Sequence, residues 1–454
     1  MSNEVMTYTD VFESAIVWLK QDPERALRMA TAVYSRDLNY GDLKEVPEGK
    51  IQNLMGVCKA GLPVKQTFGS LYHFKHAMAA DPTEPQYAVN AAYGYLLTYQ
   101  PEKAEKLALE VLENHPDFAD ACVKLFNSLQ HQGRYRDGYE AQLKYINVFD
   151  CDFSRMALGL TEFMLSDMKD EEMYRKALVN YRGRYAQLNH SLVNHPLGSP
   201  ALLKTFLEDQ DVWVFLEQGL GDSVMMIPYI QKLAAEIANR VMVVSVDHDS
   251  SIDCFESLGC FNKYKNITLI KQANYHGDPA SEPQVWMFDL LALGMPSAVC
   301  KPQKLRGNPN GKTGIVWRGN PKHPNDFWRS IPFEDMKPFI KQNGKHLLSL
   351  QSNLTIEEAE FLKANGVEID HSIPGYDHLC EVVGNLKQVV TVDTFMSHLA
   401  GYMGVPCALL LSTVADWRWG ISDVKTPWYT NHSLLRQSKI GDWKALLNDV
   451  QRSI

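Results

Sequence analysis

The loop Glu217–Asp222, with the sequence EQGLGD, carries residues suited to binding an oxygen-rich ligand. It follows an apolar run typical of a strand and precedes an amphipathic run that predicts a helix opening at Ser223. Gly219 and Gly221 permit a tight turn and a close backbone approach, and the helix N-terminus offers free N–H groups to an oxygen or phosphate. A glycine turn capped by Asp222 is the purely structural alternative. Asp222 places a carboxylate after the carboxyl end of the predicted strand, where parallel sheets bind ligands, and this favours the functional interpretation.

A second loop, from Trp317 to Ser330, concentrates cationic and amide side chains directly after the strand-like sequence TGIVW. These side chains are Arg318, Lys322, His323 and Arg329, with Asn320 and Asn325. A diphosphate needs donors from several directions, which arginine and lysine supply together. The loop is longer than connections between a strand and a helix usually are, and long loops tend to be functional. From Lys301 to His346 the chain has ten Lys and Arg against three Asp and Glu, which also suggests an anionic ligand.

Two further segments have the residue types of a nucleotide site. Asp393 ends the strand-like run QVVTVD, and Thr394, Ser397 and His398 fall at the start of the following predicted helix, where a phosphate would fit. The alternative there is an N-cap beside a partly buried histidine. The run Asp416–Trp419 (DWRW) combines aromatic rings that stack on a base or sugar with the donor Arg418, although the same rings are suited to packing a helix.

The elements before these loops are helical. Residues 84–115 predict two short helices with a break at Gln100-Pro101, and Pro82 recurs as Pro116 at a spacing of 34 residues. This is the tetratricopeptide period, and Met78, Leu112 and Ile146 repeat it. Helical patterns also cover 10–36 and 154–186. We therefore expect degenerate tetratricopeptide-like repeats within a helical domain of residues 1–200.

After a cluster of turn residues at 194–200 the period changes to short apolar runs alternating with amphipathic helices. One series begins at Asp211, and a second begins with TGIVW after the Pro/Gly/Asn-rich stretch 301–312. Strands alternating with helices predict parallel sheets, which bind ligands at the carboxyl ends of their strands. We expect two Rossmann-like halves, 201–305 and 306–454, facing each other across a cleft.

The composition is that of a soluble globular protein. The chain has 454 residues, 45 Lys and Arg against 54 Asp and Glu, a net charge of −9, and 45% hydrophobic residues. No apolar run approaches the length of a membrane span, and the N-terminus has no basic signal region. The eight cysteines show no C-x-x-C spacing and are expected as buried thiols. These features predict a cytoplasmic protein without membrane insertion.

The motifs, taken together and in this order, resemble a known family. The pairing of EQGLGD with GIVWRGNPKHPNDFWRSIP, SLQ, VVTVDTFMSHLAG and DWRW resembles glycosyltransferases of the GT-B fold in which tetratricopeptide repeats precede a heptosyltransferase-like region. The chain is also distantly similar to protein O-linked N-acetylglucosamine transferases. The resemblance covers roughly residues 70–454.

The resemblance implies an inverting, metal-independent glycosyltransferase that moves a sugar from a nucleotide-sugar donor to a hydroxyl of a protein or glycan, with no further cofactor. It implies Asp222 as the base, Arg318 or Lys322 as compensation for the leaving diphosphate, and Asp393, Thr394 and His398 as ligands of the donor phosphate. The other expected donor contacts are Gly219, Gly221, Trp317, Asn320, Asn325, Arg329, Gln351, Ser397, Trp417 and Arg418. Phe395 departs from the small residue usual at its position, which puts donor choice in doubt.

Three other interpretations remain open. A metal-dependent transferase would use a D-x-D pair such as Asp247/Asp249, but the pattern also occurs at Asp150/Asp152 and Asp209/Asp211. A non-catalytic repeat scaffold would keep the nucleotide-sugar fold only as a binding module, with the repeats recruiting a partner. A transferase acting on a modified base in phage DNA would need phosphate neutralisation, which the charge of −9 opposes.

Overall fold

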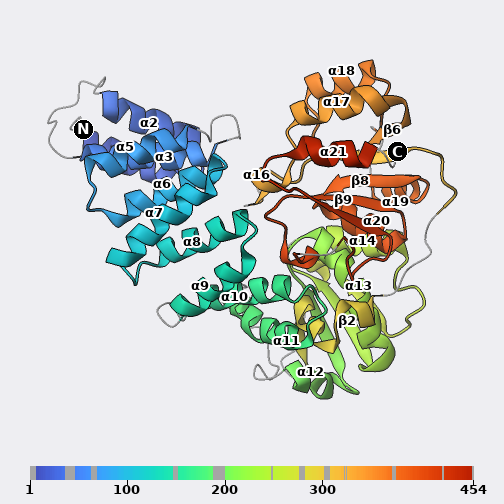
Figure 1. Ribbon diagram of the computed structural model, residues 1–454. Helices are drawn as coiled ribbons and strands as arrows, with labels where there is room; N and C mark the ends of the chain where they lie inside the picture. The colour runs from blue at the N-terminus through green and yellow to red at the C-terminus, as the bar shows by residue number, and fades with distance from the viewer. Residues whose placement is uncertain are drawn as a thin grey trace, which may run out of the picture. The chain divides into compact units, whose positions relative to one another are not determined.

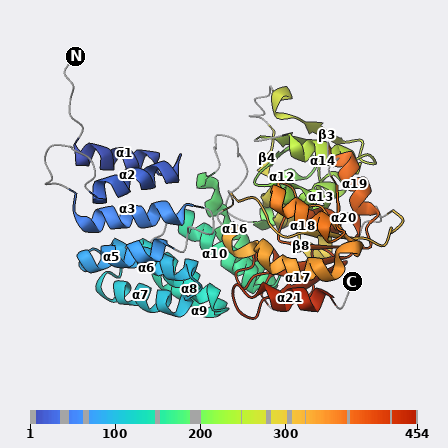
Figure 2. The ribbon, with the colours of Figure 1, turned by 90° about the horizontal axis from the view of Figure 1, so that it is seen from above.

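The computed structural model describes residues 7–35, 46–62, 69–146, 152–187, 200–246, 249–275, 282–300, 307–321, 323, 325–370, 375–421 and 424–451. The chain divides into two compact units, Met1–Phe149 and Asp150–Ile454. This division differs from the boundary expected at residue 200, because the helices between 152 and 207 pack against the later 3₁₀ helices Met287–Leu293 and Trp417–Trp419. Figures 1 and 2 give two views of the ribbon.

The first unit consists, in its described part, of short helices packed in antiparallel pairs (Figure 2). Proline opens three of them, at Pro23, Pro85 and Pro101, where a missing N–H costs nothing because the first turn has no intrahelical acceptor. The helices are α1 (Tyr8–Trp18), α2 (Pro23–Ser35), α3 (Glu48–Ala60), α5 (Ser70–Ala80), α6 (Pro85–Leu97), α7 (Pro101–Asn114), α8 (Ala119–His131) and α9 (Tyr135–Ile146).

The expected 34-residue period is present in these helices. α6 starts at Pro85 and α8 at Ala119, while α7 starts at Pro101 and α9 at Tyr135, so both members of the pair recur after 34 residues. The helices cross at small residues: a Cβ on Gly94 would lie 2.9 Å from the Leu71 Cα. The helical repeats are therefore tetratricopeptide-like, as the sequence predicts.

The second unit begins with the helices α10 (Asp152–Leu165), α11 (Glu171–Asn180) and α12 (Pro200–Leu207), with the 3₁₀ helix η1 (Tyr181–Gln187). A four-stranded parallel sheet follows, in the order β3-β2-β1-β4. Its strands are β1 (Asp211–Leu216), β2 (Arg240–Ser245), β3 (Ile267–Ile270) and β4 (Gln284–Trp286), and its connections include α13 (Leu220–Glu236), α14 (Ser250–Leu258), η2 (Gln272–Asn274), η3 (Met287–Leu293) and α15 (Pro296–Val299).

A second parallel sheet has six strands in the order β10-β9-β8-β5-β6-β7. Numbered from its first strand, this is the order 3-2-1-4-5-6 of doubly wound dinucleotide-binding sheets. The strands are β5 (Thr313–Val316), β6 (Leu347–Ser349), β7 (Glu368–Ile369), β8 (Gln388–Val392), β9 (Cys407–Leu411) and β10 (His432–Arg436). The helices are α16 (Asp326–Arg329), α17 (Phe333–Asn343), η4 (Gly344–His346), α18 (Ile356–Ala364), α19 (Tyr376–Gly384), α20 (Phe395–Met403), η5 (Trp417–Trp419) and α21 (Trp443–Gln451).

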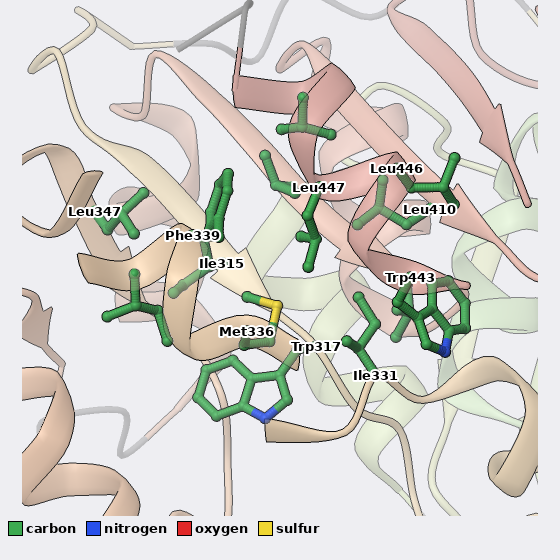
Figure 3. Close-up of a cluster of buried hydrophobic side chains, with 14 of the residues drawn as sticks. Ile315, Trp317, Ile331, Met336, Phe339, Leu347, Leu410, Trp443, Leu446 and Leu447 are labelled. Carbon is green, nitrogen blue, oxygen red and sulfur yellow. The ribbon is translucent and has the colours of Figure 1, made fainter. Parts of the chain in front are cut away.

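One face of the second sheet is covered by α17, α18 and α21, which form the hydrophobic cluster of Figure 3. Ile315 from β5 and Leu410 from β9 meet Met336, Phe339 and Trp443 from the helices there. α13 of the first sheet packs against α20 of the second. The parallel sheets are thus confirmed; the short strands β4 and β10 are additions that the sequence patterns do not indicate. In the described part of the chain no helix has the length and apolarity needed to cross a membrane.

Candidate functional site

The carboxyl end of the first sheet is filled by a buried charge network. Glu217 follows β1 and Asp289 lies in η3 after β4, so both carboxylates stand where the strand order reverses. The Arg184 guanidinium of η1 lies 3.1 Å from Glu217 and 2.7 Å from Asp289, and all three side chains are at most 5% exposed. The Tyr185 hydroxyl also donates to Asp289 at 2.5 Å. The chain's own charged side chains therefore occupy this end of the first sheet.

Burial raises the pKa of Glu217, and the Arg184 charge opposes this rise. Glu217 also accepts the Phe288 backbone N–H at 3.2 Å, so it ties β1 to η3. Gln218, the next residue, donates to the Tyr181 hydroxyl at 2.7 Å and has a φ of 61°. The start of the glycine loop is therefore held by η1.

The glycine loop places Asp222 in the first turn of α13, where its Oδ2 accepts the Gly219 N–H at 3.0 Å. A Cβ on Gly221 would lie only 2.8 Å from the His398 Cδ2 and 3.3 Å from the Phe395 Cα. Gly221 thus permits a close approach of α13 to α20, and its role here is contact between the two sheets' helices.

Asp222 is paired with a cation from the second sheet. The Arg418 guanidinium contacts the Asp222 Oδ1, and it also lies 3.1 Å from the Gln218 Oε1 and 2.6 Å from the Asp416 Oδ1. The Arg418 side chain is 9% exposed. Burial raises the pKa of Asp222, whereas the Arg418 charge and the Gly219 N–H lower it. The glycine loop and the DWRW segment therefore form one site.

Asp393 and Thr394 lie at the carboxyl end of β8, next to β5, where the strand order of the second sheet reverses. Burial and the nearby Asp416 carboxylate raise the pKa of Asp393 to about 6, while the charges of Arg329 and Arg418 lower it. Thr394 is the N-cap of α20, but its side chain makes no cap hydrogen bond; its carbonyl accepts from the Ser397 hydroxyl at 2.8 Å. No described side chain caps the first turn of α20, in which the Ser397 N–H donates to the Thr394 carbonyl at 3.0 Å.

The loop after β5 contains two cations with different surroundings. Arg318 contacts the Glu358 carboxylate and the Asn353 carbonyl, so its fork is bound to the start of α18. Arg329 lies 3.2 Å from Asp326 and reaches Gly319, where a Cβ would be 2.5 Å from its Nη2. Among the described cations of this loop, Arg329 is the one whose charge lowers the pKa of Asp393. Lys322 lies outside the described residues.

The remaining polar residues of this loop shape it. The Asn320 carbonyl accepts the His323 N–H at 2.9 Å, and the Asn325 N–H donates to the His323 Nδ1 at 3.2 Å. Burial and the Arg329 charge lower the pKa of His323. The Gln351 Oε1 accepts the N–H groups of Trp317 and Arg318 at 3.1 and 3.0 Å. Gln351 therefore fixes the backbone at the start of the loop after β5.

Three expected donor contacts are buried in the fold. Trp317 is 1% exposed and belongs to the cluster of Figure 3. Trp417 is 4% exposed, and its ring lies 4.8 Å from that of Phe163. His398 stacks on Trp419 with ring centroids 5.2 Å apart, bonds the Tyr429 hydroxyl through Nδ1, and has a pKa far below its usual range because it is buried. These positions favour the packing alternatives for Trp417 and His398.

The structure therefore brings together Asp222, Arg329, Asp393, Thr394 and Arg418, from segments far apart in the sequence. The sequence patterns assign no role to Asp416, which caps η5 by accepting the Arg418 N–H at 3.1 Å. The sequence signal that could have indicated this role is an aspartate two residues before Arg418, a spacing at which its carboxylate can cap a short helix. The patterns also assign no role to Arg184 and Asp289, the pair that holds Glu217 at the start of the glycine loop. Nothing local marks Arg184. Among the described residues no group of three or more His, Cys, Asp or Glu is arranged to hold a metal ion; Asp247 lies outside them.

Among solved structures, the chain is similar to repeat proteins. A thermophilic TPR protein of Thermus thermophilus is 12% identical over 41% of this chain and 93% of its own, with a TM-score of 0.33. MamA of Desulfovibrio magneticus is 14% identical over 42% of this chain and 99% of its own, with a TM-score of 0.32. No protein-family model and no curated protein matches the chain.

Proposed function

We propose that the chain is an inverting, metal-independent glycosyltransferase of the GT-B type that uses a nucleotide-sugar donor. The observation that carries the proposal is the convergence of Asp222, from the first sheet, with Arg418, Arg329 and Asp393, from the second. Carboxylate and cations stand where a doubly wound sheet binds its ligand.

The reaction assigns a role to each of these groups. The acceptor hydroxyl attacks the anomeric carbon of the donor while Asp222 takes its proton, and the bond from that carbon to the diphosphate breaks. Arg418, Arg329 and the first N–H groups of α20 stabilise the negative charge that develops on the departing diphosphate. Because attack and departure occur on opposite sides of the carbon, the configuration inverts.

The charge network around Arg184 supports the second sheet as the donor side. It fills the corresponding crevice of the first sheet with the chain's own side chains. At the second reversal point none of the described side chains caps the start of α20, so the N–H groups that precede Ser397 are the backbone donors for a phosphate. The protein or glycan acceptor would then approach Asp222 from the first sheet.

Binding of nucleoside diphosphates, measured by calorimetry in the presence of a chelator, tests the proposal. We expect saturable binding of one nucleoside diphosphate, and an increase in unfolding free energy of about 2.7 kcal/mol at a ligand concentration of 100 Kd. If no nucleotide binds, the glycosyltransferase assignment is rejected and a non-catalytic scaffold is favoured.

Asp222→Asn separates chemistry from binding. The amide keeps the size of the side chain but cannot accept the acceptor's proton, so we expect turnover to fall at least about 100-fold while diphosphate affinity stays within a few-fold of the original. Asp211→Asn, which removes a carboxylate paired with Arg240 at the opposite end of β1, is the control outside the proposed proton transfer. Full turnover of Asp222→Asn would reject Asp222 as the base.

A further inference from the structure

Asp167 lies in the turn between α10 and α11, outside the motifs discussed so far. The turn is unusual because Asp167 and the following Met168 have φ angles of 45° and 54°. Its backbone is held by the bond from the Asp167 N–H to the Met164 carbonyl at 3.2 Å and by the bond from the Met168 N–H to the Ser166 hydroxyl at 3.0 Å. Left-handed conformations of residues other than glycine are costly and persist where the surroundings enforce them.

The Asp167 side chain contacts the backbone just after η5. Its Oδ1 accepts the Ile421 N–H at 2.7 Å. Gly420 has a φ of 62°, and a Cβ there would lie 2.2 Å from the same Oδ1. The contact therefore needs both a carboxylate at 167 and the absence of a side chain at 420.

The same segment is fixed on its other sides. The Trp428 indole N–H donates to the Arg418 carbonyl at 2.9 Å, and Arg436 donates to the Trp419 carbonyl. Phe163, on α10, packs its ring 4.8 Å from Trp417. Together with these contacts, the Asp167 carboxylate fixes the backbone of η5, the single turn that carries Arg418.

We propose that Asp167 is a positioning residue for Arg418: it fixes the end of η5 so that the Arg418 guanidinium spans Asp222 and the diphosphate site. This inference rests on the proposed function for the ligand, whereas the Arg418–Asp222 pairing is independent of it. Small displacements of a positioned charged group weaken its effect strongly, because its hydrogen bonds depend on distance and angle.

Two substitutions isolate the carboxylate. Asp167→Gly removes the acceptor, and glycine adopts the left-handed conformation without strain. Asp167→Asn keeps an Oδ1 acceptor and a residue type tolerant of that conformation. Each is made alone and together with Arg418→Gln, so that an effect exerted through Arg418 is separated from general destabilisation.

The first readout needs no ligand. The titration of Asp222 is followed by NMR of protein labelled with ¹³Cγ-aspartate, with the Asp222→Asn spectrum as the assignment. Since the Arg418 charge lowers the pKa of Asp222, we expect Asp167→Gly to raise it, Asp167→Asn to leave it near its original value, and Asp167→Gly to add nothing in Arg418→Gln. An unchanged Asp222 titration in Asp167→Gly, or an equal change in both backgrounds, would overturn the proposal.

The second readout is the calorimetric affinity for inorganic pyrophosphate in chelator. We expect Asp167→Gly to weaken it about fivefold, the effect of one lost hydrogen bond, and to have no effect in Arg418→Gln. If the unsubstituted protein binds pyrophosphate and Asp167→Gly binds it with the same affinity, the positioning role is contradicted. If the parent binds neither pyrophosphate nor any nucleoside diphosphate, the proposed function fails, and the Asp222 titration alone decides the role of Asp167.

Discussion

Arg318, expected to compensate the leaving diphosphate, and Arg418, an expected donor contact, have different partners. Arg318 is bound to Glu358, which also caps α18, while Arg418 joins Asp222 and Asp416. The resemblance points to Arg318 or Lys322 as the cation for the leaving diphosphate. In the described residues the geometry favours Arg418 and Arg329.

Substitution of the two arginines by glutamine is expected to give opposite patterns. Arg418→Gln removes charge-assisted hydrogen bonds to the ligand and should weaken diphosphate binding by about 10- to 100-fold. Arg318→Gln should change this affinity less than about threefold and lower the melting temperature instead, because Glu358 loses its partner. Calorimetry and thermal unfolding of both variants check the assignment; equal losses of affinity would contradict it.

The fold disfavours the charged form of Asp393, since its pKa is raised to about 6 from 3.8. A carboxyl with a raised pKa in the folded state contributes stability below its unfolded pKa, and this contribution is lost as the pH rises through about 6. Asp393→Asn should therefore raise the unfolding free energy at pH 7.5 by about 1–3 kcal/mol, with the gain disappearing towards pH 4.

The matched control for Asp393 is Asp211→Asn. The pKa of Asp211 is lowered by Arg240, so its charged form is favoured in the folded protein. Asparagine there should leave stability unchanged or slightly reduced at pH 7.5, the opposite sign to Asp393→Asn. Denaturant unfolding at several pH values distinguishes the two, and a loss of stability in Asp393→Asn at pH 7.5 would refute the argument.

At the scale of elements, η1 joins the end of β1 to η3, because its Arg184 pairs with Glu217 and Asp289. Removing one partner of a buried ion pair leaves the other charges unpaired, so Arg184→Met should reduce the unfolding free energy by about 3–5 kcal/mol. Arg175→Met on the neighbouring α11, where the pair with Glu171 is exposed, should change it by less than about 0.5 kcal/mol. Denaturant titrations measure both; a small effect at Arg184 would show that the network is dispensable.

The helical pairs of the first unit also carry buried histidines. His73 and His131 are 6% and 5% exposed, and burial lowers their pKa values from 6.5 to about 4 and about 3. A lowered histidine pKa means that the neutral form stabilises the fold, and that this stability is lost as the pH falls below the unfolded value of 6.5. The loss begins below pH 6.5 and continues towards pH 4.

His131 occupies the position of the buried Leu97 one repeat earlier, which suggests a test. In the full chain, His131→Leu should show a smaller fall of melting temperature between pH 7.5 and 5.5 than the original protein, because one protonation site is gone. His115→Gln, at an exposed position, should leave the fall unchanged. An identical pH dependence for His131→Leu would contradict the role of its burial.

For the whole molecule, period and spacing in the sequence determined the main architecture. The 34-residue recurrence predicts the pairs α6/α7 and α8/α9, and the alternation of apolar runs with amphipathic helices predicts the parallel strands β1, β2, β5, β8 and β9. These patterns are readable because each helix or strand is marked by apolar residues close together in the sequence, and the repeat is marked by a constant spacing. The glycosyltransferase activity stays a prediction.

Only the tertiary structure decided which candidate residues meet. Arg418 is 196 residues from Asp222 along the chain, and nothing local in either segment specifies their pairing. Neighbours from distant strands and helices likewise determine the contacts of three expected ligand residues, Arg318, Trp317 and Gln351. In the structure these residues contact other parts of the chain. The sequence supplied the residue types and the strand ends; long-range packing chose, from these candidates, the ones that share a site.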